Sequence, residues 1–198
     1  LTQGFNGRYS HRGWAKYSLD FGLKEGEEIY ASRDGIVVDI KEDSDKGGRG
    51  RKYKIYANYI TIYHNDGTFA QYVHIQKNGC IVNIGDYVKA GQLIGYSGKT
   101  GRVKGPHLHF MVFKPVYMDR MTIPISIIGT NNEFVQLKAL RYYTSYHPDK
   151  VNLTNNIHIA SLSTNLNDLE ENIVSNYSNL HKLSKGIASN DNDVGGIE

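Results

Sequence analysis

Two histidines, His107 and His109, stand one residue apart in the apolar segment 105–113 (GPHLHFMVF). Side chains alternate between the two faces of a β-strand, so a strand here turns both imidazoles to the same side. The opposite face would then carry apolar side chains and pack on a core. Such a strand can offer two imidazoles to a metal ion or a substrate. It can equally be a partly exposed strand with two unrelated histidines.

Two earlier segments carry further groups of the same chemical kind. His11 lies in a Gly-rich loop before a predicted strand at 17–21 (YSLDF), and this strand carries Asp20. His74 stands near the end of another predicted strand, at 71–75 (QYVHI). The chain therefore supplies four imidazoles and one carboxylate from segments that a β-sheet can bring together.

A catalytic zinc ion usually has three protein ligands from His, Asp or Glu and keeps one position open for water. His11, Asp20 and His109 can supply such a set. His74 and His107 would then remain unligated and available for proton transfer, which a hydrolytic site needs. The sequence has no helical His-Glu-x-x-His and no cysteine pair, so the spacing alone does not prove a zinc site.

The elements that must position these residues are predicted to be short strands joined by turns. Asn65-Asp66-Gly67 has the residues of a hairpin turn, and 43–52 is predicted to be a mobile loop. No alternation of strands with helices is apparent. We therefore expect a mainly β fold of antiparallel sheets. Besides 17–21 and the His107 strand, the predicted strands are 28–32, 35–41, 54–64, 68–75, 87–90, 92–96 and 122–128.

The composition sets bounds on the class of protein. The chain has 198 residues, 39% of them hydrophobic, and a net charge of +3, which fits one globular domain with an appendage. That charge is too small to argue for nucleic acid and is compatible with an anionic surface such as a bacterial wall. No apolar run reaches the ~20 residues of a membrane span. The chain begins at Leu1, so a targeting segment would not be visible here.

The character of the sequence changes at about residue 148. We predict a catalytic domain over 1–147 and an Asn- and Ser-rich extension over 148–198. Apolar residues recur at three- and four-residue steps between 164 and 185, which predicts an amphipathic helix, followed by a disordered tail from 188. This helix is expected to dock on the domain or to contact a partner.

The motifs, taken in order, resemble a known family. The quoted segments resemble the signature of the LytM/lysostaphin-type zinc metallopeptidases, which form the M23 peptidase family. The resemblance covers roughly residues 3–128, and 85–95 (GDYVKAGQLIG) resembles the lipoyl/biotinyl-like hybrid hairpin of that fold. The motifs are 10–13 (SHRG), 17–21 (YSLDF), 72–75 (YVHI) and 105–110 (GPHLHF).

The resemblance implies one Zn²⁺ per chain, bound by His11, Asp20 and His109. It further implies that His107 is the general base and that His74 is a second catalytic imidazole that steadies the transition state. Asp20 follows His11 by nine residues, whereas the best-known branch of the family has the pair four apart. By the same resemblance, the substrates are peptides of bacterial peptidoglycan, in the stem or the cross-bridge. The location is then the cell envelope, either periplasmic or secreted.

Two other functions are compatible with parts of the pattern. A catalytically silent scaffold of this family would bind the wall or activate a wall amidase, but the intact set of five residues favours an enzyme. A biotinyl-type carrier would need a lysine in a Met-Lys setting, and Lys89 has no preceding methionine. Of the remaining histidines, His64 stands beside a turn and is predicted to lie at the surface.

Overall fold

The structure is a computed structural model of the chain, and it describes residues 1–117, 119–128 and 133–143. The predicted boundary at 147/148, the predicted helix at 164–185 and the predicted tail lie outside the described residues. Within the described residues, no helix is long and apolar enough to cross a membrane.

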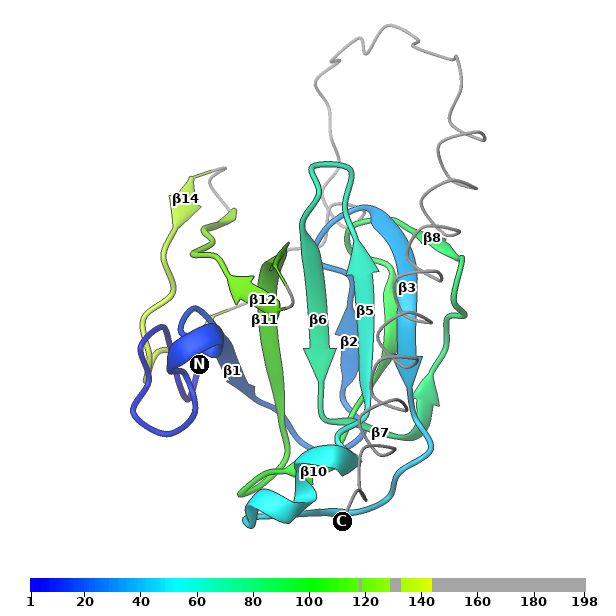
Figure 1. Cartoon of the computed structure of the whole chain (residues 1–198), viewed down its shortest axis with the longest axis vertical. Coiled ribbons are helices and arrows are strands. Elements are labelled where there is room, and N and C mark those ends of the chain that lie inside the picture. Colours follow the sequence, from blue (N-terminus) through cyan, green and yellow to red (C-terminus); the bar gives the residue numbers. More distant parts are fainter. Residues whose placement is uncertain (118, 129–132, 144–198) are drawn as a thin grey trace, which may run out of the picture. The chain divides into compact units, whose positions relative to one another are not determined.

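The described elements are mostly short antiparallel strands, which confirms the predicted fold class. In the described part of the chain, the largest sheet has seven strands in the order β1-β11-β6-β5-β3-β8, with β12 pairing with β11 (Figure 1). Its strands are β1 (Leu19–Gly22), β3 (Gly35–Lys41), β5 (Tyr59–Tyr63), β6 (Phe69–Val73), β8 (Tyr87–Val88), β11 (His107–Val116) and β12 (Asp119–Thr122).

A second antiparallel sheet has the order β2-β9-β7. In the segment 85–95, which was expected to form a hairpin, β8 belongs to the large sheet and β9 belongs to the second sheet. Part of the predicted loop 43–52 forms a parallel pair with residues of the loop that precedes His107. The remaining elements are β2 (Glu28–Tyr30), β4 (Gly47–Gly48), β7 (Ile75–Cys80), β9 (Leu93–Ser97), β10 (Gly101–Arg102), β13 (Ile127–Ile128), β14 (Phe134–Val135) and the 3₁₀ helices η1 (Gly13–Ala15) and η2 (Arg51–Tyr56).

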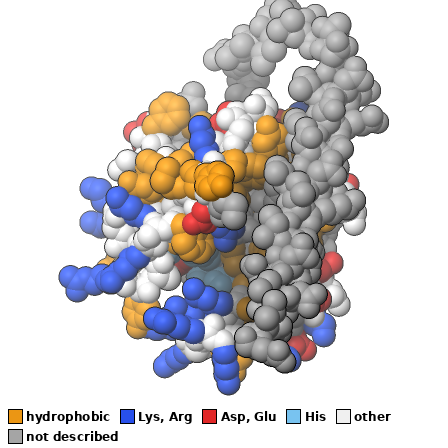
Figure 2. Space-filling view, viewed as in Figure 1, with side chains coloured by type: hydrophobic (Ala, Val, Ile, Leu, Met, Phe, Trp, Pro, Cys, Tyr) orange, Lys and Arg blue, Asp and Glu red, His pale blue; other side chains and the backbone are white. Residues whose placement is uncertain are grey.

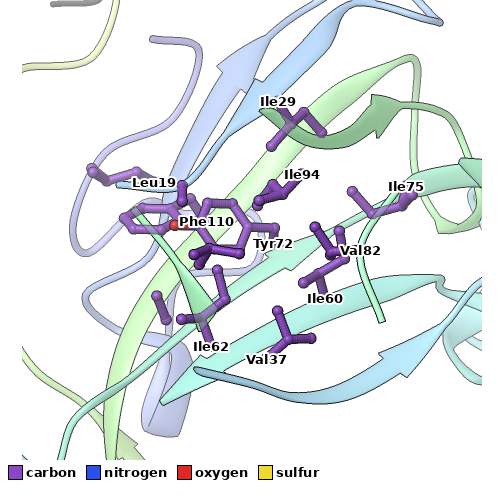
Figure 3. Close-up of a cluster of buried hydrophobic side chains, with 13 residues drawn as sticks. Leu19, Ile29, Val37, Ile60, Ile62, Tyr72, Ile75, Val82, Ile94 and Phe110 are labelled. Atoms are coloured by element: carbon purple, nitrogen blue, oxygen red, sulfur yellow. The ribbon is translucent and has the colours of Figure 1, made fainter. Parts of the chain in front are cut away.

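The main core lies between these two sheets. Alternate residues of β5 and β6 point into it, because successive side chains of a strand face opposite sides. Tyr72 and Phe110 meet there with ring centroids 5.1 Å apart, and Ile94 approaches from the second sheet (Figure 3). The other face of β11 and β6 is therefore free to carry the polar groups of a site.

The hairpin β5–β6 forms at the predicted turn. Gly67 has φ +79°, a conformation that glycine adopts without steric cost, and Asp66 Oδ1 accepts a hydrogen bond from Thr68 N. The strand predicted at 54–64 starts later than expected, at Tyr59, because η2 occupies the preceding residues.

The prediction for His64 is wrong, since its side chain is buried. Its Nδ1 lies 2.8 Å from the main-chain oxygen of Asp34. A Cβ at Gly35 would come within 2.9 Å of the same Nδ1, so the absent side chain at Gly35 makes room for the imidazole. Burial lowers the pKa of His64.

Candidate metal centre

The pairing of β1 with β11 places two of the predicted ligands opposite each other. Asp20 on β1 is in register with His109 on β11. Both strands present these side chains on the face away from the main core. His109 Nδ1 lies 2.7 Å from Asp20 Oδ1. A pairing between residues 89 positions apart thus brings a carboxylate and an imidazole into contact.

His11 completes the set from the N-terminal loop. Its ring is fully buried, Nδ1 lies 2.7 Å from the main-chain oxygen of Gly4, and Nε2 lies 3.1 Å from Asp20 Oδ1. The potential ligand atoms of His11, Asp20 and His109 all lie within 4.8 Å of one another. The structure therefore brings together the three residues that the sequence predicted as a set.

The hydrogen bonding of His11 tests whether this arrangement fits a metal ion. The carbonyl of Gly4 only accepts, so Nδ1 of His11 carries the hydrogen, and in neutral His11 a lone pair on Nε2 faces Asp20. Two electron-rich atoms 3.1 Å apart need a positive charge between them, either a proton or a metal ion. Two imidazole nitrogens and one carboxylate oxygen form a donor set that zinc accepts. The residues present therefore fit a zinc ion.

The electrostatics of Asp20 point the same way. Burial raises the pKa of this carboxyl, but the polar contacts with His109 and His11 outweigh burial and hold the pKa well below its usual range. Asp20 is therefore ionised at neutral pH. A buried anion that is surrounded by imidazoles is a favourable place for a cation.

His107 and His74 lie beside this set. His107 Nε2 is 3.9 Å from Asp20 Oδ1, and the rings of His74 and His107 have centroids 4.6 Å apart. Nδ1 of His107 lies 2.9 Å from the carbonyl of Gly105, and Nδ1 of His74 lies 2.7 Å from that of Thr100. Both imidazoles therefore keep the hydrogen on Nδ1 and present Nε2 as the free nitrogen.

The backbone of His74 explains how a residue next to a core strand reaches the site. Its φ is +74°, in the left-handed region that residues other than glycine rarely adopt. Val73 shares a register position with His109, so continued alternation would turn His74 toward the core. The left-handed conformation interrupts this alternation. Such outliers persist where the surroundings impose them, and they cluster at functional sites.

Residues that the sequence analysis did not single out hold these groups in place. Asn58 is fully buried, and its carbonyl accepts a hydrogen bond from His74 N. Thr100 Oγ1 accepts from Asn58 N and donates to the carbonyl of Ile75. Gln3 donates to Asp20 Oδ2 at 2.7 Å. The signal for Asn58 and Thr100 was weak, since single polar residues in predicted loops or strands are common.

Part of the site reaches the exterior. The side chains of His107 and His109 are 18% and 13% exposed. Figure 2 shows a pale-blue histidine surface with Lys and Arg side chains near it. Burial lowers the pKa of His109 and lowers that of His74 to about 3; for His74 the neighbouring imidazoles add to the effect. The partly exposed His109 is thus a neutral imidazole at one side of the cluster.

The comparison with protein families identifies the class of the chain. A model described as Peptidase family M23 matches residues 15–120, and the chain belongs to this family. The matched range contains Asp20, His74, His107 and His109. His11 lies before it, in the loop where the spacing departs from the best-known branch.

Individual relatives match shorter stretches. ShyA of Vibrio cholerae, named a peptidoglycan DD-endopeptidase, is 34% identical over 125 residues, which cover 62% of this chain and 26% of ShyA. Lysostaphin of Staphylococcus simulans is 39% identical over 99 residues, which cover 50% of this chain and 18% of lysostaphin. The solved catalytic domain of that lysostaphin has 30% identity and a TM-score of 0.42, and the match covers 59% of this chain and 78% of that domain. The chain thus spans about a quarter or less of the length of these curated relatives.

Proposed function

We propose that this chain is a zinc-dependent endopeptidase that hydrolyses peptide bonds of bacterial peptidoglycan. The observation that carries the proposal is the convergence of His11, Asp20 and His109 within 4.8 Å, with the rings of His74 and His107 alongside. Membership of peptidase family M23 supports a peptidase, and ShyA, a relative at 34% identity, is named for action on peptidoglycan.

In this proposal, His11 Nε2, Asp20 Oδ1 and His109 Nδ1 hold one zinc ion. When bound at such a site, zinc lowers the pKa of a coordinated water to about 7 and polarises a carbonyl group. The carbonyl of Gly4 fixes the orientation of His11 and leaves its Nε2 available. Such support from outside the ligand shell is a general feature of metal sites with histidine ligands.

His107 is proposed as the general base. Its Nδ1 hydrogen is donated to Gly105, so the lone pair on Nε2 can accept a proton from the attacking water and later return it to the leaving amine. Its partial exposure suits a group that exchanges protons with substrate.

His74 is proposed as the second catalytic imidazole. Because its Nδ1 hydrogen is donated to Thr100 and its pKa is lowered to about 3, Nε2 accepts rather than donates in the resting site. Donation to the developing oxyanion therefore requires that His74 first gain a proton on Nε2. Until then, its Nε2 can orient the water by accepting a hydrogen bond.

The proposed substrates place the protein at the cell envelope, either in the periplasm or outside the cell. The experiment is digestion of cross-linked peptidoglycan by zinc-loaded protein, with the new amine termini counted with and without a chelator. We expect termini to appear, to stop with the chelator and to return on adding zinc. A protein that binds zinc yet releases no termini would instead support the catalytically silent scaffold.

A further inference from the structure

The side chain of Gln3 joins the two proposed ligands that come from the N-terminal part of the chain. Its Nε2 donates to Asp20 Oδ2 at 2.7 Å and to Ser10 Oγ at 2.9 Å. Its Oε1 accepts a hydrogen bond from Tyr9 N at 3.0 Å. Ser10 directly precedes His11, so one amide group contacts the carboxylate ligand and the loop that presents the imidazole ligand.

The orientation of this amide is fixed by its partners. A main-chain N–H only donates, so the atom facing Tyr9 must be the oxygen of Gln3. A carboxylate only accepts when ionised, so the atom facing Asp20 must be the nitrogen. A flipped amide would lose both bonds and place like partners against each other.

The backbone and a glycine support the same position. Gln3 forms an antiparallel bridge with Asp20, in which Asp20 N donates to Gln3 O at 2.8 Å. A Cβ at Gly7 would lie 2.2 Å from Gln3 Cγ. The side chain of Gln3 can therefore cross this turn only because residue 7 has no side chain.

We propose that Gln3 is a positioning residue for the metal centre. By occupying Oδ2 of Asp20, it leaves Oδ1 to face His11 and His109. By its hydrogen bonds to Tyr9 and Ser10, it fixes the loop that presents His11 to the site. The inference rests on the proposed zinc function and adds to it a residue outside the ligand set.

The test compares the zinc affinity of the wild-type chain with that of three single variants and of the double variant Gln3→Met/Gly7→Ala. Gln3→Met keeps the length of the side chain and removes its hydrogen bonds to Asp20, Ser10 and Tyr9. Gly7→Ala leaves Gln3 chemically intact but displaces its side chain. Thr2→Val is the matched control, because it removes only the hydrogen bond from Thr2 Oγ1 to the main-chain oxygen of Asp20.

Zinc dissociation constants are measured by chelator competition on folded protein, together with the melting temperature of the metal-free form. We expect Gln3→Met and Gly7→Ala each to weaken zinc binding about 10–100-fold, which is the usual effect of removing such support. The double variant should be no weaker than the worse single variant, since both act on one group. Thr2→Val should stay close to wild type. The visible spectrum of bound Co²⁺ should change in Gln3→Met, because ligand geometry changes.

Two different results would overturn the inference. If wild type binds zinc and both variants bind it equally well, Gln3 has no positioning role, while the proposed function stands. If the variants lower only the melting temperature of the metal-free form and not the zinc affinity, Gln3 is purely structural and the positioning role is again excluded. If wild type binds no zinc, the proposed metal function fails and the role of Gln3 fails with it.

Discussion

Two buried histidines, His11 and His64, have the same local support but different surroundings. Each has Nδ1 held by a main-chain carbonyl, at 2.7 Å from Gly4 and 2.8 Å from Asp34. His11 then turns Nε2 toward Asp20. Within the described part of the chain, His64 pairs with no carboxylate.

The positions of the two histidines on the sheet explain this difference. His64 follows β5 at the end where Tyr63 is in register with Phe69. The candidate metal centre lies at the other end, where Val73 is in register with His109. Burial and a carbonyl partner thus orient an imidazole, and only convergence on a carboxylate makes a candidate metal centre. The predictions below apply matched changes to these two regions.

The largest effect is expected from His109→Ala. Two protein ligands remain, so the zinc content should fall from about one ion per chain to near zero, and peptidoglycan cleavage should fall to background. Metal analysis of the purified protein and the count of new amine termini measure this. Retention of stoichiometric zinc would show that His109 is not a ligand.

His107→Ala should separate proton transfer from metal binding. We expect zinc content to stay at the wild-type level and turnover to fall about 10²–10⁴-fold, the usual contribution of a general base. Steady-state cleavage of a defined muropeptide, with metal analysis of the same sample, measures both quantities. Turnover close to wild type would remove His107 from the role of base.

A histidine-to-alanine change outside the candidate metal centre, His64→Ala, should leave zinc content unchanged. It removes the partner of the Asp34 carbonyl and leaves a cavity beside Gly35, so we expect a loss of about 1–3 kcal/mol in the free energy of unfolding. Denaturant unfolding measures the loss. A fall in zinc content of the folded variant would mean that the two regions are coupled.

The smallest effect is a pH dependence from His64. Its pKa in the folded protein is lowered from 6.5, so below pH 6.5 the unfolded chain binds the proton more readily. Stability from the neutral imidazole is thus present above pH 6.5 and is lost as pH falls through 6.5 toward the folded pKa. The slope contributed by one group is at most about 1.4 kcal/mol per pH unit. The contribution is measured from the change in unfolding free energy between pH 8 and pH 5, which is compared between wild type and His64→Ala. An equal change in both proteins would contradict the lowered pKa of His64.

Much of the site could be predicted because strand alternation is a local property. The LDF and HLH motifs place Asp20 and His109 on defined faces of their strands, and register then brings them together. The hairpin at 65–67 follows from turn chemistry in the same way. Strand alternation therefore predicts the faces of β1 and β11, whereas their pairing is seen only in the structure and the set of His11, Asp20 and His109 is implied by the family resemblance.

Other features depend on contacts that no local pattern contains. The left-handed backbone of His74 is held by Asn58 and Thr100, which are distant in sequence. The burial of His64 depends on the close approach of Gly35, about thirty residues earlier. Gln3 gains its role only when the N-terminal segment bridges to Asp20.

The most direct measurement is anomalous X-ray diffraction at the zinc edge from crystals grown with zinc. The account predicts a single peak at His11 Nε2, Asp20 Oδ1 and His109 Nδ1, with ligand distances of about 2.0–2.2 Å and one position open to solvent. A peak bound by other residues, or none at this cluster with zinc present, would contradict the account.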